Sequence, residues 1–293
     1  KNRAYYRNAT DNVWVAASGV MQPGLGYIVM TDNTSKTVSV ATSVTFSGTM
    51  NNGRVIQPVV INNSKWNLLG NPYPSALDAV DFVTDNTTIG GSLYFWTHNT
   101  RISETNTLSS GLKGSFTQND YAVWNSSGGT SPAATIGSPV TDAYSNLISS
   151  GGNSVAPTGE IAAGQAFFVE ALSASNVTFK NCQRTTTAGL NNNFYKSANS
   201  IQKDRFWLDI ANESGAFKQM LVGYFEGATD GNDRLYDAKL RNGDNKVAIY
   251  TTSHDDSTGE NYKYSIEGKA SPFNDSDVVP IGITLRDGAG SEN

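Results

Sequence analysis

Cysteine and histidine are almost absent from this sequence of 293 residues, which has one cysteine, Cys182, and two histidines. A single cysteine forms neither an internal disulfide nor a cysteine-rich zinc site. The histidines, His98 and His254, accompany no Gly-x-Ser-x-Gly elbow, so the sequence carries no signature of a Ser-His or Cys-His nucleophile. Any two acids can converge in a fold, so an enzyme with a carboxylate pair stays open as a third alternative. We expect the chain not to be an enzyme.

Charge and long apolar runs are also scarce. Charged residues make up 16% of the chain and the net charge is −5. Since basic residues form no cluster, we expect no nucleic-acid partner. Since no apolar run reaches the length of a bilayer, we expect no membrane span. No signal peptide is visible at Lys1, and strand-like sequence begins at Ala4, so we expect the chain to be a fragment of a larger protein.

In place of charge the sequence has Ser, Thr, Asn and 28 glycines, with 13 Tyr, 12 Phe and 5 Trp to fill a core. This balance is typical of all-β proteins. Short apolar runs, some alternating with polar residues, predict half-buried strands separated by turns. The clearest of these strands cover residues 13–15, 27–30, 55–61, 93–96, 121–124 and 166–170. Residues 125–159, rich in Gly, Ser, Pro and Thr, are expected to form a surface loop with little regular structure.

The segment 66–75, Trp-Asn-Leu-Leu-Gly-Asn-Pro-Tyr-Pro-Ser, predicts a strand, a rigid turn and a short helix. Gly and Asn-Pro are turn formers, and each proline restricts the residue before it. Ser75, with an acidic residue three positions later, matches a helix N-cap pattern, so a helix is expected near residues 75–83. A structural role is assigned to six residues of the segment: Trp66, Gly70, Asn71, Pro72, Tyr73 and Pro74.

A weak internal repeat relates two parts of the chain. Residues 24–29 followed by 44–46 resemble residues 164–169 followed by 177–179, and residues 4–7 resemble residues 93–96. Each copy would give strands to one jelly-roll-like sandwich, with a Gly-x-Gly or Gly-x-Ala kink turning a corner. The segment 66–75 would open the second copy, and the matching opening of the first copy is missing from the sequence.

The composition predicts two β-sandwich domains. Residues 1–185 are expected to form the jelly-roll-like first sandwich. Residues 186–202 contain Thr and Asn runs with few apolar residues and are interpreted as a linker. Residues 203–293 are expected to form a second, smaller sandwich.

With these motifs laid out, the chain resembles the type IX secretion cargo proteins of Bacteroidetes. The matching pieces lie in both predicted domains, at residues 66–75, 93–96, 164–169, 204–208, 215–219, 236–240 and 279–282. The resemblance implies a module that precedes a C-terminal sorting domain, in a protein found outside a Gram-negative cell or on its outer surface. It also implies a structural or adhesive function, with the secretion machinery or other surface proteins as partners. This chain has no recognisable sorting domain of its own, so its export rests on the resemblance.

An acidic loop at residues 229–237 is the best candidate for a metal site. Asp230, Asn232, Asp233 and Asp237 offer hard oxygen ligands at short spacing around a glycine, as calcium prefers. The loop lacks the glutamate that closes an EF-hand. The alternative is an Asx-rich turn whose carboxylates cap backbone N–H groups. Two weaker candidates of the same kind are Asp255 and Asp256 with Glu260, and Asp275 with Asp277.

Carbohydrate binding is the alternative function, in an accessory domain of a secreted enzyme. Tyr94, Trp96 and Trp124 can stack on sugar rings, and jelly-roll sandwiches often hold such sites. Aromatic residues within alternating strands are more often part of the core, and we expect this for Trp66 and Trp207 in particular.

Overall fold

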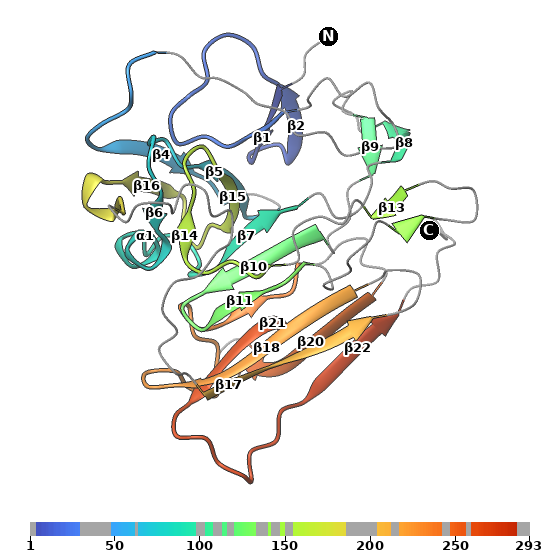
Figure 1. Ribbon diagram of the computed structural model, residues 1–293. Helices are drawn as coiled ribbons and strands as arrows, with labels where there is room; N and C mark the ends of the chain where they lie inside the picture. Colours follow the sequence, from blue (N-terminus) through green and yellow to red (C-terminus); the bar gives the residue numbers. More distant parts are fainter. Residues whose placement is uncertain are drawn as a thin grey trace. The chain divides into compact units, whose positions relative to one another are not determined.

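The computed structural model describes residues 4–29, 48–61, 64–97, 103–107, 113–115, 120–132, 140–141, 147–149, 155–185, 204–211, 217–241, 247–255 and 259–285. The predicted all-β, sandwich-like fold is confirmed: these residues form several β-sheets and one α-helix (Figure 1). Within them, no helix has the length and apolar character needed to cross a membrane.

Contacts divide the chain into two compact units. The first unit comprises Lys1–Phe95, Ile102–Ser115 and Gly159–Phe194, and the second comprises Trp96–Arg101, Phe116–Thr158 and Tyr195–Asn293. The middle of the chain is thus shared between the units. The domain boundaries inferred from composition stay a prediction, and the proposed linker at 186–202 lies outside the described residues.

The first unit contains most of the N-terminal strands. Two antiparallel groups form its centre, β2-β1-β3 and β7-β15-β5, and three further pairs are β16-β4, β14-β6 and β8-β9. The elements are β1 (Ala4–Asn8), β2 (Val13–Ala16), β3 (Tyr27–Val29), β4 (Val55–Val59), β5 (Trp66–Gly70), β6 (Leu77–Asp78), α1 (Ala79–Asp85), β7 (Leu93–Trp96), β8 (Ser103–Thr107), β9 (Lys113–Ser115), β14 (Glu160–Ile161), β15 (Ala166–Glu170), β16 (Ser175–Phe179) and the 3₁₀ turn η2 (Asn181–Gln183).

Each edge of strand β5 is paired with a segment that contains or follows a glycine: residues 24–26 on one edge and β15, just after Gly164, on the other. On one edge the N–H of Gly26 donates to Leu68 O at 3.1 Å, and on the other β15 pairs along the whole of β5. Gly24 and Gly164, equivalent positions of the repeat, both have left-handed backbone, with φ of 86° and 69°. A Cβ on Gly26 would lie 2.6 Å from the Leu68 side chain, so the close approach requires glycine there.

Equivalent positions of the repeat also pair in the same register. Tyr5 of β1 lies opposite Ile28 of β3, and Tyr94 of β7 lies opposite Phe168 of β15. In the repeat, Tyr5 corresponds to Tyr94 and Ile28 to Phe168, so the two strand pairs are built alike. The remaining segment of the first copy, residues 44–46, lies outside the described residues.

The core of the first unit is aromatic and includes the helix α1. Phe82 of α1 packs edge-on against Phe167 at 5.5 Å and stacks on Phe179 at 5.0 Å between ring centroids. The helix begins later than expected: Asp78, and not Ser75, is its N-cap and accepts a bond from Asp81 N at 3.1 Å. The prediction fails because residues 77–78 are drawn into a strand pair with β14, which delays the helix.

The turn after β5 is held by one buried side chain, that of Asn71. Its Nδ2 group donates to three carbonyl oxygens at 2.9–3.0 Å, those of Ser75, Ile161 and Ala162. Its Oδ1 atom accepts from Tyr73 N at 3.0 Å. The side chain therefore closes the turn and ties it to the segment that leads into β15.

The other residues of the turn are placed around Asn71. Tyr73 is buried and its hydroxyl donates to Gly53 O at 2.5 Å. Pro72 O accepts from the side chain of Asn51 at 2.8 Å. Trp66 is half-buried and meets Tyr94 edge-on, with 4.9 Å between ring centroids. These contacts hold the turn in place, and the structural role assigned to the segment stays a prediction.

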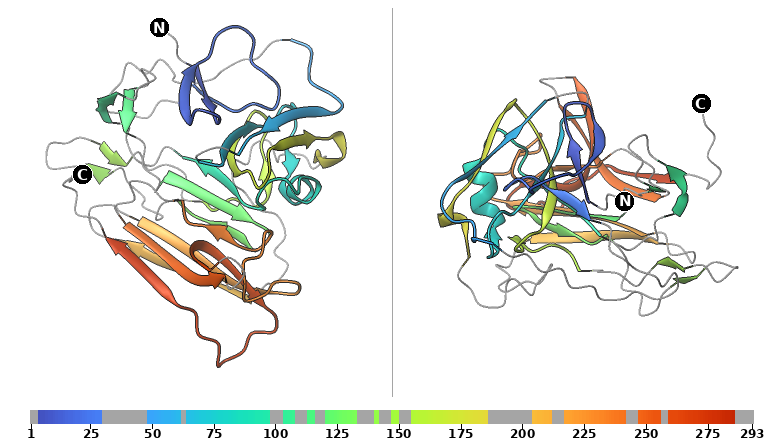
Figure 2. Two further views of the ribbon diagram at one scale, coloured as in Figure 1. Left: turned by 180° about the vertical axis from the view of Figure 1, so that it is seen from behind. Right: turned by 90° about the horizontal axis from the view of Figure 1, so that it is seen from above.

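The second unit is centred on one sheet with the order β17-β18-β21-β20-β22, in which β18 and β21 are parallel and the other neighbours antiparallel. These strands, coloured orange to red, run side by side in the left view of Figure 2. The elements of the unit are β10 (Tyr121–Asn125), β11 (Gly128–Thr130), β12 (Val140–Thr141), β13 (Leu147–Ser149), β17 (Asp204–Ala211), β18 (Phe217–Phe225), β19 (Ala238–Lys239), β20 (Val247–Asp255), β21 (Glu260–Ala270) and β22 (Ile281–Leu285).

The hairpin β10-β11 lies on one face of this sheet. Ser131 N donates to Gln219 Oε1 at 2.8 Å, and Ser127 Oγ donates to Tyr236 O at 2.9 Å. The expectation of an irregular loop at residues 125–159 is therefore wrong for its first part. The Gly-Gly sequence of β11 has no side chains with which to signal a strand, and backbone pairing with β10 supplies the structure.

Candidate functional site

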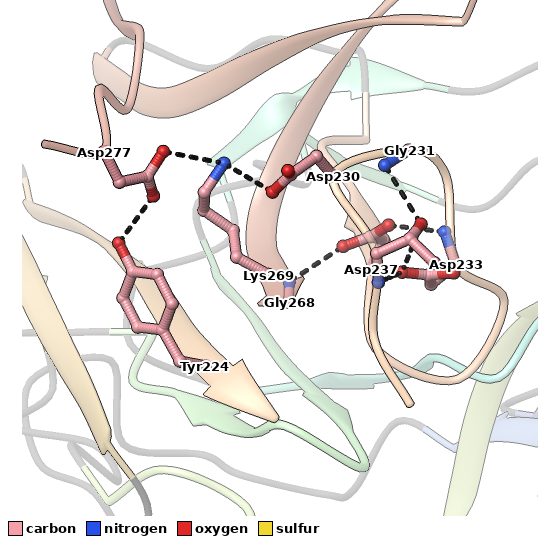
Figure 3. Close-up of polar contacts among 9 residues, drawn as sticks. Tyr224, Asp230, Gly231, Asp233, Asp237, Gly268, Lys269 and Asp277 are labelled. Carbon is pink, nitrogen blue, oxygen red and sulfur yellow. Dashed lines mark hydrogen bonds and ion pairs between the residues drawn. The ribbon is translucent and has the colours of Figure 1, made fainter. Parts of the chain in front are cut away.

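The acidic loop and the end of β21 form the main polar cluster described in the second unit (Figure 3). Loop residues 229–237 connect β18 to β19, and β19 pairs with β21. The loop therefore lies against β21, where Gly268 and Lys269 face it.

Two of the four predicted calcium ligands bind the backbone of the loop region. Asp233 Oδ2 accepts from Thr229 N at 2.5 Å and from Thr229 Oγ1 at 3.0 Å. Asp237 accepts from Asp233 N at 2.6 Å and from Gly268 N at 2.8 Å. Both carboxylates thus act as Asx-type caps, and Asp237 also fastens the loop to β21.

The other two predicted ligands point to different partners. Asn232 Oδ1 accepts from the hydroxyl of Tyr264 at 3.0 Å. Asp230, which is largely exposed, pairs with Lys269 Nζ at 3.0 Å. The four side chains therefore share a loop but not a common centre. Among the described residues, no group of three or more His, Cys, Asp or Glu side chains is placed to hold a metal ion.

Lys269 is the centre of the polar cluster. Its side chain is 9% exposed and its Nζ lies 3.0 Å from Asp230 and 3.4 Å from Asp277. Asp277 in turn accepts from the hydroxyl of Tyr224 at 2.8 Å. Tyr224 and Lys269 are directly paired on the neighbouring strands β18 and β21, so the sheet register brings them together. The cluster ties two loops to the sheet.

Electrostatics keep Lys269 protonated. Burial alone would lower its pKa, but the hydrogen bond to Asp230 and the charges of Asp230, Glu267 and Asp277 raise it. Burial, with the bond to Asp277, raises the pKa of Tyr224 to about 12. A lysine that stays an ammonium is neither a nucleophile nor a base, and here it forms ion pairs with Asp230 and Asp277.

Two buried acids near Lys269 have raised pKa values, because burial disfavours their charged forms. Burial raises the pKa of Asp237 to about 7, against the effect of its two backbone N–H donors. Burial also raises the pKa of Glu267, whose Oε2 atom is buried without a hydrogen-bond partner. Burial therefore shifts both groups toward protonation relative to an exposed carboxyl, which makes the stability of this region depend on pH.

The weaker acidic candidates are only partly covered by the described residues. Asp277 belongs to the Lys269 cluster, Asp256 lies outside the described residues, and Glu260 is exposed opposite Asp255 in the β20-β21 pair. His254 Nδ1 lies 2.9 Å from Asn261 Oδ1 on the same strand pair, and His98 lies outside the described residues.

The aromatic residues predicted to bind sugars are mostly covered. Tyr94 and Trp124 are each 3% exposed, which leaves no ring face on which a sugar could stack. Trp96 is half-buried. Both covered rings come from strands of four or five residues that are buried on both faces, so alternation could not distinguish an inward from an outward side chain.

Sequence reasoning missed Lys269, Tyr224 and Glu267. Lys269 and Glu267 stand in a strand with polar and charged residues at almost every other position, which is typical of an exposed edge. The signal that sets them apart is the parallel pairing of β18 with β21, a contact between segments more than 40 residues apart. Such pairing is invisible to local patterns.

Comparison with known proteins gives a family without a function. The chain belongs to the family described as a domain of unknown function, DUF8693, which matches residues 2–290. No curated protein and no solved structure matches the chain.

Proposed function

We propose that this DUF8693 chain is a non-catalytic structural or adhesive module of a protein that type IX secretion exports to the outer surface of a Gram-negative bacterium. The proposal is supported by the motifs shared with type IX cargo proteins, in particular residues 66–75 and 204–208. Its partners would be other surface proteins and, during export, the secretion machinery.

The observation that carries an interaction role is the exposed apolar side of β22. This strand stands at one end of the second unit's sheet, and Ile281, Ile283 and Leu285 are 48%, 56% and 69% exposed. Proteins usually avoid exposed apolar residues on an edge strand, because its backbone groups can pair with another chain. Exposed apolar groups of this kind mark interaction surfaces. The exposed apolar side chains of β22 therefore support the proposal that this module contacts a partner.

The internal polar contacts support a structural module. Asn86, which is buried, exchanges hydrogen bonds with the backbone of Thr178, 92 residues away, as Asn71 does with Ile161 and Ala162. Asn67, also buried, bonds both backbone groups of Val60, and the buried Gln183 donates to the side chain of Asp85 at 2.7 Å. Secreted domains often rely on disulfides for this purpose. Here buried side-chain amides connect the segments, in a chain with one cysteine that is exposed.

The proposal is tested with microspheres coated with the purified chain. We expect them to adhere under flow to the cells that produce the protein or to their deposited matrix, and free chain to compete. Ile283→Lys should reduce the adhesion, whereas Val80→Lys, at an exposed apolar residue of α1 in the first unit, should not. Microspheres that adhere no better than albumin-coated ones would contradict the proposal.

A second candidate function is a carbohydrate-binding accessory domain of a secreted enzyme. It is favoured by Trp207 of β17. We expected this residue to lie in the core, but 41% of its surface is exposed. The prediction failed because β17 stands at the other end of the sheet, where its side chains are only partly covered. Saccharide binding without cell adhesion would favour this function over the first.

A further inference from the structure

The indole of Trp207 is fixed in place although it is exposed. Its Nε1–H group donates to Gly129 O of β11 at 3.0 Å. The guanidinium carbon of Arg205 lies 4.9 Å from the centre of the indole ring, a cation–π distance. Arg205 is held in turn by its bond to Ser127 O at 3.1 Å. The indole is thus held by the bond of its Nε1–H group and by the fixed Arg205 side chain. A side chain that is already held in place loses little conformational entropy when a ligand stacks on it.

An acid is fixed beside the indole on the same side of β17. Asp209 follows Trp207 by two positions, so both side chains leave the same face of the strand. Gln219 accepts from Ser131 N at 2.8 Å and donates to Asp209 Oδ1 at 2.8 Å. The hairpin β10-β11 therefore positions both Trp207 and Asp209, in one case directly and in the other through Gln219.

We infer that Arg205, Trp207 and Asp209, the β17 platform, bind a pyranose ring of a glycan. The apolar face of a sugar stacks on an aromatic ring, and its hydroxyls need acceptors and donors at the ring's margin. Asp209 is an acceptor beside the ring. Arg205, whose guanidinium lies over one face of the indole, carries several donors, and the sugar stacks on the other face. The spacing suits one sugar unit, because residues two apart along a strand are separated by about 6.8 Å. The inference rests on the second candidate function proposed above, carbohydrate binding, and names its site and ligand class.

A purely structural indole would be arranged differently. An indole that served only to anchor β11 to β17 would gain most by being covered, since burial of a large aromatic side chain is worth several times one hydrogen bond. Trp207 instead makes the bond and keeps 41% of its surface exposed. Phe206, the preceding residue, is 38% exposed but points to the opposite face and has no such polar neighbours described. It is a matched control.

The test uses the whole chain and neutral hexasaccharides of glucose, xylose, mannose and N-acetylglucosamine as probes. Titration calorimetry should detect binding of at least one probe at millimolar or lower concentration, with a change in tryptophan fluorescence. Trp207→Ala should weaken that binding about tenfold or more, the loss expected for one stacked aromatic contact. Asp209→Ala should weaken it also, and Phe206→Ala should leave it within about twofold, since its side chain leaves the opposite face.

Asp209→Ala keeps the inference testable if Trp207→Ala does not fold, because it leaves the indole and its bond to Gly129 in place. Failure of every probe to bind, binding that survives both substitutions, or preference of the platform for extended peptides would overturn the inference. If microspheres still adhere to cells while no probe binds, the platform fails and the adhesive function stands. If the probes bind through Trp207 and the microspheres do not adhere, the adhesive function fails and the platform stands.

Discussion

Replacing Asn71 by alanine should destabilise the first unit more than any other single change in the turn after β5. The side chain has two N–H donors and one acceptor engaged, which corresponds to about three hydrogen bonds of about 1 kcal/mol each. The substitution also removes the Asn71 partner of the buried Tyr73 N and of Ile161 O, whereas Ala162 O keeps its bond from Gln165 N. An unsatisfied buried group costs about 1–3 kcal/mol. We therefore expect a loss of about 3–5 kcal/mol in the free energy of unfolding.

The assay is equilibrium urea unfolding followed by far-UV circular dichroism and by tryptophan fluorescence, to which Trp66 of β5 contributes with the other four tryptophans. Asn181→Ala is the matched control, because this asparagine also binds a backbone N–H, that of Gly53 at 3.1 Å, but is exposed. It should cost less than about 1 kcal/mol. Asn71→Asp keeps the acceptor for Tyr73 but places a carboxylate against carbonyl oxygens, so it should be at least as damaging as alanine. Equal stability of Asn71→Ala and Asn181→Ala would refute the reasoning.

Three further predictions concern pH, metal and packing. Because the folded-state pKa of Asp237 is about 7 and its ordinary value is 3.8, the stability that this group contributes is complete below about pH 4 and is lost as the pH rises through 7. We expect the decline to be roughly 1–4 kcal/mol in urea unfolding, and Asp237→Asn should flatten it. A pH profile that Asp237→Asn leaves unchanged would contradict this prediction. Calcium bound at about 100 times its dissociation constant would add about 2.7 kcal/mol to the free energy of unfolding. The carboxylates of loop 230–237 already have partners, so we expect equal melting temperatures in calcium and in chelator. A higher melting temperature in calcium would establish the predicted site. Gly26→Ala should cost more than about 2 kcal/mol because its Cβ would lie 2.6 Å from Leu68, whereas Gly90→Ala, with its nearest neighbour at 3.8 Å, should cost little; similar melting temperatures for the two variants would count against the close approach.

The strands that could be predicted were those with strong local patterns. The runs Leu93–Trp96 and Ala166–Glu170 contain adjacent aromatic residues with high strand propensity, and the structure forms β7 and β15 there. The turn at Gly70 and Asn71 was also predictable, since glycine and Asn-Pro restrict the backbone whatever surrounds them. Its stabilisation by Asn71 was not, because two of the bonded carbonyl groups, those of Ile161 and Ala162, are about 90 residues away.

The parts that sequence reasoning missed depend on pairing between distant segments. Ser75 matched a capping pattern, but the β6-β14 pair moved the cap to Asp78. Trp207 looked like a core residue, and its place on an end strand made it half-exposed. Lys269 became the centre of a cluster because β18 runs parallel to β21, and nothing in either strand's local sequence indicates that neighbour.

The central claim, that the chain belongs to an exported surface module, is tested most directly by labelling intact cells of the producing bacterium with an antibody raised against the purified chain. The account predicts labelling of unbroken cells, and loss of that labelling after brief treatment with an external protease. Labelling that appears only after the cells are lysed, with the protein protected from protease until then, would contradict it.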